Sequence, residues 1–280
     1  MKDVILDTLI DSLKLIPFLF VAFLIIELIE HKFSKKTKKV ISKSGKFGPL
    51  LGSILGLFPQ CGFSVMATNL YVTRIISLGT LIAIYLSTSD EMLPIMLSHN
   101  VEASLIFTIL GIKFLVGVVF GFIIDFFFFR RKKEVINYDI CSEEGCHCES
   151  GLVLSTVKHT VHTILFIALV SFALNTLVYY VGEERLSLIL LKDNIFSFFL
   201  SSLIGLIPNC ASSIMITELY LSGALSLGSA MAGLLTGSGV SLLVLFKSNK
   251  NFKENLFILL SIYVIGVFSG ICIELFQMLI

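Results

Sequence analysis

Long apolar stretches, separated by short polar ones, run through the whole chain. Each stretch is long enough for a helix that crosses or enters the hydrocarbon core of a bilayer, which needs about 20 residues. The pattern therefore predicts an all-α polytopic membrane protein. The expected elements are Val4–Ile29, Phe47–Val72, Ile75–Leu97, Ala103–Phe129, Leu152–Val181, Asn194–Leu221, Ala224–Phe246 and Asn255–Ile280.

Composition agrees with the pattern, since 56% of the 280 residues are hydrophobic and only 15% are charged. A soluble domain of this size needs more polar surface, so lipid is the expected solvent. The first stretch, Val4–Ile29, is too long for a signal peptide and lacks a small-residue cleavage site. A net charge of +1 gives no indication of a nucleic-acid partner.

One stretch occurs twice. Gly56–Tyr71 reads GLFPQCGFSVMATNLY, and Gly205–Tyr220 reads GLIPNCASSIMITELY, 149 positions later without a gap. The match continues through Ser77-Leu78-Gly79 and Ser226-Leu227-Gly228. Such a match at half the chain length indicates one structural unit used twice, as in many transporters.

Both copies of the repeat interrupt their apolar stretch with a proline. Phe47–Val72 could be one kinked span or a hairpin of two half-helices that returns to the same side. Basic loops favour the cytoplasm. The clusters His31–Lys46 and Arg130–Lys133 fall on the same side only if the stretch returns, so we expect a hairpin. Each arm has about eleven residues, or roughly 16 Å of helix, which puts the tip near the midplane.

The second half repeats this plan with a hairpin in Asn194–Leu221, and Lys247, Lys250 and Lys253 form a third basic loop. Each half has an odd number of membrane elements when each hairpin arm counts as one, so the second half should be inverted relative to the first. The expected division is 1–130 for the first repeat, 131–151 for a cytoplasmic linker and 152–280 for the second repeat. The N-terminus is then outside.

The hairpin tips carry the first candidate ligands, because irregular backbone in a bilayer is tolerated only within protein or beside water. Pro59 and Pro208 form the tips, the amides of Gln60 and Asn209 follow, and Cys61 and Cys210 offer soft sulfur. The alternative is that both cysteines are merely small residues that ease helix packing.

The span after each hairpin is also interrupted, and its polar residues are the second set of candidates. A charge at that depth is costly and usually functional. We expect an unwound turn that binds a cation or a coupling proton, the alternative being an ordinary outer loop up to Pro94. The candidates are Ser87, Thr88, Ser89, Asp90 and Glu91 in the first half, and Thr236 and Ser238 in the second.

Further polar residues are weaker candidates. Glu218, at the position equivalent to Asn69, is either a second carboxylate or a residue at the membrane surface. His159 and His162 are expected at the headgroup level. The linker gathers thiols and an imidazole that could hold a metal ion, although the spacing C-x₄-C-H-C matches no structural zinc module and a reduced, disordered loop is the alternative. These linker residues are Cys141, Cys146, His147 and Cys148.

These motifs together resemble a known family. GLFPQCGFS with LSTSDEMLP, and IPNCASS with GLLTGSGV, are similar to the sequences of ten-span heavy-metal exporters, a family related by name to the arsenical permeases, with members often labelled manganese transporters. The resemblance covers nearly the whole chain and implies a prokaryotic plasma-membrane permease. It marks as motif positions Pro59, Gln60, Cys61, Ser89, Asp90, Glu91, Pro208, Asn209 and Cys210. Relatives often have His-rich linkers, whereas this linker is Cys-rich.

The sequence therefore predicts a secondary-active transporter that exports a manganese-like divalent cation or an arsenical. No nucleotide-binding loop is present, so an ion gradient should drive it, with the proton as the candidate coupling ion, and no cofactor is expected. The alternatives are an ion channel or a transporter of another small solute. An enzyme is disfavoured because no nucleophile–base pair has a convincing spacing. An oligomer is compatible with the sequence.

Overall fold

The computed structural model describes residues 47–58, 61–89, 91–128 and 196–279, together with single positions between 16 and 24 and between 157 and 176. All secondary structure within these residues is helical. The single positions in the predicted spans Val4–Ile29 and Leu152–Val181 are helical as well. The linker 131–151 lies outside the described residues.

Both predicted hairpins are pairs of short helices. The first consists of α3 (Gly48–Gly56) and α4 (Cys61–Val72), and the second of α11 (Phe196–Gly205) and α12 (Cys210–Leu221). Each pair is interrupted at the proline-containing tip, as the sequence predicts. In the second tip, Asn209 is the N-cap of α12 and its side chain accepts a hydrogen bond from the Ala211 amide.

Each hairpin is followed by a broken span: α5 (Leu78–Ser87) with α6 (Met92–Ser98), and α13 (Leu227–Thr236) with α14 (Ser241–Ser248). The first break follows the expected Ser87–Glu91 closely, except that Ser87 is still the last residue of α5; Pro94, which follows the break, lies in the first turn of α6. Proline is compatible with a first turn, where the missing amide hydrogen has no intrahelical acceptor.

The longest helices are α7 (Ala103–Phe128) and α15 (Phe252–Leu279). Among the described residues, three segments are long and apolar enough to cross a membrane: Ala103–Phe127, Leu227–Ser248 and Phe252–Leu279. Large apolar side chains on the two long helices are exposed, with Phe126 at 79% and Leu279 at 85%. A bilayer would cover such a surface.

The two halves have the same internal contacts, 149 positions apart. The Gly79 amide donates to Asp125 of α7 over 2.9 Å, and the Gly228 amide donates to Glu274 of α15 over 3.0 Å. The helices α3, α5 and α7 pack together in the first half, as α11, α13 and α15 do in the second. The sequence repeat is therefore also a repeat of structure.

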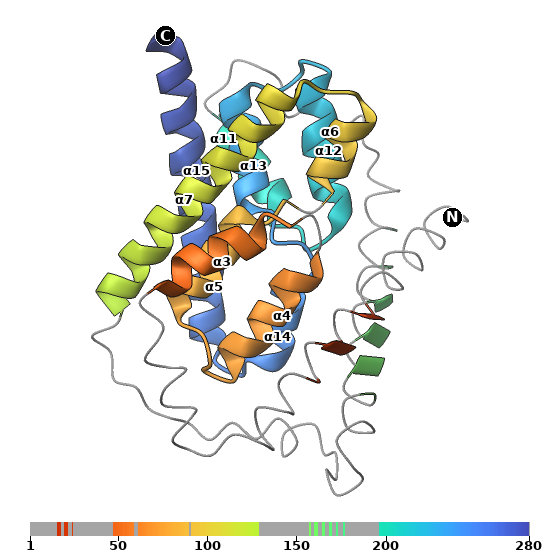
Figure 1. The fold of residues 1–280 in the computed structure, drawn as a ribbon, viewed down its shortest axis with the longest axis vertical. Helices are drawn as coiled ribbons and strands as arrows, with labels where there is room; N and C mark the ends of the chain where they lie inside the picture. The colour runs from red at the N-terminus through yellow and green to blue at the C-terminus, as the bar shows by residue number, and fades with distance from the viewer. Residues whose placement is uncertain are drawn as a thin grey trace, which may run out of the picture.

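The halves interlock. In Figure 1, α3, α4, α5 and α14 occupy the lower part, and α6, α11, α12 and α13 the upper part. The equivalent helices α7 and α15 run in opposite directions, α7 towards the lower left and α15 upward to the C-terminus (Figure 1). As a result, α4 of the first hairpin packs against α14, and α12 of the second packs against α6.

Candidate functional site

Buried polar side chains lie in the two breaks and at the helix ends beside them. The side chains of Ser87, Thr88 and Ser89 are at most 2% exposed, and those of Thr236 and Ser238 are fully buried. The apolar core of the interlocked halves surrounds them. Polar groups at this depth need partners in the protein, a water molecule or an ion.

Each break lies against the first arm of its own hairpin. In the first half, Ser89 Oγ donates to the Leu57 carbonyl over 2.6 Å, at the end of α3. In the second, Thr236 Oγ1 donates to the Ser202 carbonyl of α11 over 3.0 Å. Glycines beside these contacts allow the close approach of the arms: a Cβ on Gly56 would collide with Ser87, and one on Gly205 with Thr236.

In the second hairpin tip Pro208 is half-buried and the two residues after it are buried, whereas the first tip is described only in part. Asn209 is 4% exposed, and Cys210 is a buried thiol that is not disulfide-bonded. Ser213 Oγ donates to the Cys210 carbonyl over 2.9 Å. Pro59, Gln60 and the side chain of Cys61 lie outside the described residues.

The predicted acids of the first break are described only at Glu91, which is half-buried and precedes α6. Asp90 lies outside the described residues, as do the linker candidates and the two histidines His159 and His162. Within the described part of the chain, no group of three or more His, Cys, Asp or Glu side chains gathers. The possible ligand atoms described at the breaks are hydroxyl, carbonyl and carboxylate oxygens, which suit hard cations.

Glu218 lies at the surface. It is exposed and forms a hydrogen bond with His99 at the end of α6, with 3.0 Å between Oε1 and Nε2. This position favours the interpretation of Glu218 as a surface residue over that of a second carboxylate in the site. The equivalent Asn69 is buried, and its Nδ2 has no hydrogen-bond partner within the described residues.

Several buried polar atoms have no hydrogen-bond partner among the residues that the structure describes. Ser238 Oγ, in the second break, is one of them. Leaving such a group unpaired costs about 1–3 kcal/mol. The other hydroxyls of this kind belong to Ser53, Ser201, Ser202 and Ser269.

Two side chains that the sequence analysis did not single out join the halves. Lys113 of α7 is 1% exposed, and its Nζ donates to the Leu234 carbonyl of α13 over 2.6 Å. The Tyr85 hydroxyl of α5 lies 2.6 Å from Thr68 Oγ1 and 3.5 Å from the Ser241 carbonyl of α14. A lone lysine within an apolar run is a signal that would have marked Lys113 from the sequence.

The sequence analysis also did not single out Asp125 and Glu274. Their carboxylates accept hydrogen bonds at the starts of other helices, as capping residues do. Asp125 accepts from the Gly79 amide and from Ser77 Oγ, the latter over 2.6 Å, at the start of α5. Glu274 accepts from the Gly228 amide at the start of α13. The first amides of a helix lack intrahelical acceptors, and a carboxylate there also interacts favourably with the helix dipole.

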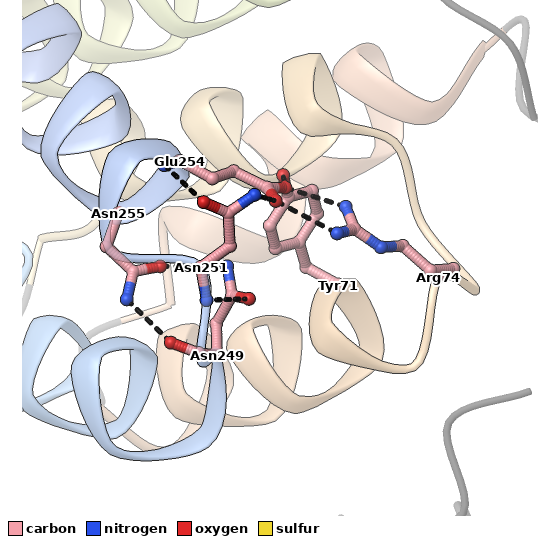
Figure 2. Close-up of polar contacts among 6 residues, drawn as sticks. All are labelled: Tyr71, Arg74, Asn249, Asn251, Glu254 and Asn255. Carbon is pink, nitrogen blue, oxygen red and sulfur yellow. Dashed lines mark hydrogen bonds and ion pairs between the residues drawn. The ribbon is translucent and has the colours of Figure 1, made fainter. Parts of the chain in front are cut away.

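A second polar cluster lies where α4 ends and α15 begins (Figure 2). Arg74 forms a two-bond ion pair with Glu254, and the Tyr71 hydroxyl donates to the same carboxylate. The hydrogen bonds to Glu254 raise the pKa of Arg74, so its guanidinium stays charged. Three asparagines complete the cluster, with Asn249 donating to Asn255 over 2.8 Å and Asn251 donating to Glu254 over 3.4 Å.

Comparison with known proteins gives one family. The family model described as "Putative, 10TM heavy-metal exporter" matches the chain over residues 1–181 and 164–279. No curated protein and no solved structure matches.

Proposed function

Because the chain belongs to this family of heavy-metal exporters, we propose that it is a secondary-active transporter that exports a metal or metalloid ion by alternating access. The cargo would bind between two inverted repeats, close to the midplane of the membrane. Transport rather than an enzymatic reaction is the activity that the family description names.

The observation that carries the proposal is the pair of helix breaks, between α5 and α6 and between α13 and α14, at which Thr88, Ser89 and Ser238 are buried. Discontinuous helices near the midplane, in equivalent positions of two repeats, are typical of ion and substrate sites in secondary transporters. The contacts of Ser89 with α3 and of Thr236 with α11 hold each break against a hairpin arm. Ser238 Oγ, buried without a partner among the described residues, supports a bound ion or water beside the second break.

The inverted arrangement is supported by the opposite directions of α7 and α15 and by the exchange of packing partners between the halves (Figure 1). Repeats at 1–130 and 152–280, joined by a cytoplasmic linker at 131–151, would place all three basic loops inside the cell. The membrane would then be the plasma membrane, with the N-terminus outside.

In this mechanism, Asp90 and Glu91 neutralise a cation or carry the coupling proton. The hydroxyls of Ser87, Thr88, Ser89, Thr236 and Ser238 and the amides of Gln60 and Asn209 complete the shell. Cys61 and Cys210 bind the cargo if it is thiophilic. The linker residues Cys141, Cys146, His147 and Cys148 could collect metal on the cytoplasmic side.

The test is uptake into everted membrane vesicles, since export from a cell becomes uptake in that orientation. Mn²⁺, Zn²⁺, Cd²⁺ and arsenite serve as separate probes, each with and without an imposed proton gradient. Asp90→Asn should abolish the activity, whereas Glu102→Gln, a similar change at an exposed position, should leave it intact. Wild-type vesicles that accumulate none of the probes under any gradient would refute the proposed function.

The same assay separates hard from soft cargo. If Cys61→Ser with Cys210→Ser leaves transport unchanged while Asp90→Asn removes it, oxygen ligands carry the cargo and a manganese-like ion is favoured. The opposite result favours an arsenical or a thiophilic metal.

An ion channel, the alternative function, would be recognised by electrical recording, as large unitary currents that do not saturate.

A further inference from the structure

The ion pair between Arg74 and Glu254 joins parts of the chain that belong to different halves (Figure 2). Arg74 follows α4, the second arm of the first hairpin, and Glu254 lies in the first turn of α15. The two hydrogen bonds between them measure 2.7 and 2.9 Å, and the buried Tyr71 donates its hydroxyl to the same carboxylate. One acid of the second half therefore holds two side chains of the first hairpin.

The geometry of this contact makes it stronger than an ordinary surface ion pair. The Glu254 side chain is only 19% exposed and that of Arg74 36%, so water and salt screen the charges incompletely. Two parallel hydrogen bonds between a guanidinium and a carboxylate also add strength and fix the relative orientation. The backbone of Arg74 is left-handed, with a φ of 61°, where glycine is favoured. An unfavourable backbone conformation of this kind points to a function of the side chain.

Asparagines connect the acid firmly to the turn between α14 and α15. Asn255 Nδ2 donates to the Asn249 carbonyl over 2.8 Å, and Asn249 Nδ2 donates to Asn255 Oδ1 over the same distance. Asn251 Oδ1 accepts from the Glu254 amide over 3.4 Å. The end of α14 and the start of α15 are therefore held together beside the acid, and α4 packs against α14.

The repeat does not reproduce this charge pair at the opposite end. The second half has Gly223 and Leu105 at the positions equivalent to the ion pair, and these cannot carry one. There, α12 of the second hairpin packs against α6, and a 3.0 Å hydrogen bond joins the exposed side chains of Glu218 and His99. The two ends of the structure are thus closed by contacts of different strength.

The position of the ion pair matters for alternating access, in which a transport site opens to one side of the membrane at a time. The stretch around the turn between α14 and α15 carries Lys247, Lys250 and Lys253, and basic loops favour the cytoplasm. If the halves separate towards the cytoplasm, α4 must leave α14 and α15. The ion pair must then break.

We propose that Arg74, Tyr71 and Glu254 form a latch that closes the transport path on the cytoplasmic side and opens each time cargo enters. This inference rests on the proposed transport function and identifies residues that decide to which side the site opens. A static brace is the other role for the same contacts. A brace is formed in every state, so its removal loosens the protein without favouring one side. A latch is formed in some states only, so its removal shifts the equilibrium between them.

Labelling of Cys210 measures the side to which the site opens, because this buried thiol lies at the second hairpin tip. A membrane-impermeant methanethiosulfonate is applied to everted vesicles, which expose the cytoplasmic face, and to right-side-out vesicles. Mass spectrometry then quantifies the labelled peptide. We expect Glu254→Gln to react about tenfold faster than the wild type from the cytoplasmic side and more slowly from the outside, since loss of the latch favours the inward-open state.

Two further variants make the test specific. Arg74→Lys keeps the charge but not the two-bond geometry, so labelling from the cytoplasmic side should be about threefold faster than in the wild type. Glu218→Gln is the matched control, the same substitution at an exposed acid of the opposite end. Because exposed polar pairs contribute little, labelling of this variant from the cytoplasmic side should stay within about twofold of the wild type.

Equal labelling of Cys210 from the cytoplasmic side in the wild type, Glu254→Gln and Arg74→Lys would overturn the proposal. So would faster labelling from both sides, which is the response of a brace, or faster labelling from the outside alone. If Glu254→Gln is not recovered in folded form, Arg74→Lys decides. If wild-type vesicles transport no probe, the proposed function fails, and the labelling of Cys210 still tests the latch.

Discussion

Arg74 and Glu254, 180 positions apart, form an ion pair through two parallel hydrogen bonds of 2.7 and 2.9 Å. The pair joins the end of the first hairpin to the start of the last helix (Figure 2). Arg74 has a φ of 61°, in the left-handed region, and its equivalent in the second half is Gly223, with a φ of 77°. The first half thus retains an arginine where the second half has the residue best suited to the backbone.

This geometry predicts the order of two substitutions. Arg74→Ala and Arg74→Gly both remove the ion pair, but only glycine relieves the backbone strain, which amounts to about 1 kcal/mol. The glycine variant should therefore be more stable than the alanine variant by about that amount, although both fall below the wild type. Thermal and denaturant unfolding in detergent measure the difference. Equal stability of the two variants would mean that the left-handed backbone carries no strain.

The close approach of hairpin arm and broken helix predicts the effect of an added methyl group. A Cβ at Gly205 would meet the Gly233 carbonyl and Thr236 Oγ1, so Gly205→Ala must displace α11 from α13. We expect a loss of about 1–3 kcal/mol in stability, together with slower transport. Gly111→Ala is the control, because a Cβ there meets nothing within 4 Å.

The control should be neutral or stabilising by about 0.5–1 kcal/mol, since alanine is the better helix former. If both variants lose the same stability, the cost comes from the backbone alone and the close contact is not responsible. Gly56→Ala, at the equivalent position against Ser87, should behave like Gly205→Ala.

The sequence predicted the helix order and both breaks because proline, glycine and the repeat mark them locally. The first break differs from the expected Ser87–Glu91 only at Ser87, which is still the last residue of α5. Lys113 and Tyr85 were missed for a physical reason: their equivalents are Ile262 and Leu234, so a search for matched polar positions passes over them. The isolated charge of Lys113 in an apolar run would have marked it as unusual, but its contact with α13, and that of Tyr85 with α14, join the two halves and are not predicted by a local pattern.

Asp125 and Glu274 allow a test of whether an acidic residue within a long apolar helix stabilises the structure or takes part in ion binding. Because Asp125 accepts from the Gly79 amide and from Ser77 Oγ, its role is to hold the start of α5. Asp125→Ala should cost about 1–2 kcal/mol, the typical value for a lost helix cap. Asp125→Asn keeps an acceptor oxygen and should cost less. Unfolding experiments and Mn²⁺ binding to the purified variants measure the two effects.

The affinity for Mn²⁺ should stay within about twofold of the wild type in every Asp125 variant that folds, because the carboxylate is committed to the helix start. Glu274→Gln should likewise lower the stability of the protein while leaving its affinity for Mn²⁺ unchanged. A folded Asp125→Asn protein without Mn²⁺ binding would instead assign this acid to the ion pathway.

Tyr85 provides the last prediction, because its hydroxyl lies between Thr68 of the first hairpin and Ser241 at the start of α14. Alternating access requires the two halves to move against each other, so a hydrogen bond between them biases the equilibrium between the inward- and outward-open states. Tyr85→Phe should change stability by only about 1 kcal/mol but slow Mn²⁺ uptake into everted vesicles several-fold. Tyr263→Phe, whose hydroxyl contacts the Phe199 carbonyl within the second half, should leave uptake unchanged. Equal rates in the wild type and both variants would show that the Tyr85 hydroxyl takes no part in the transition.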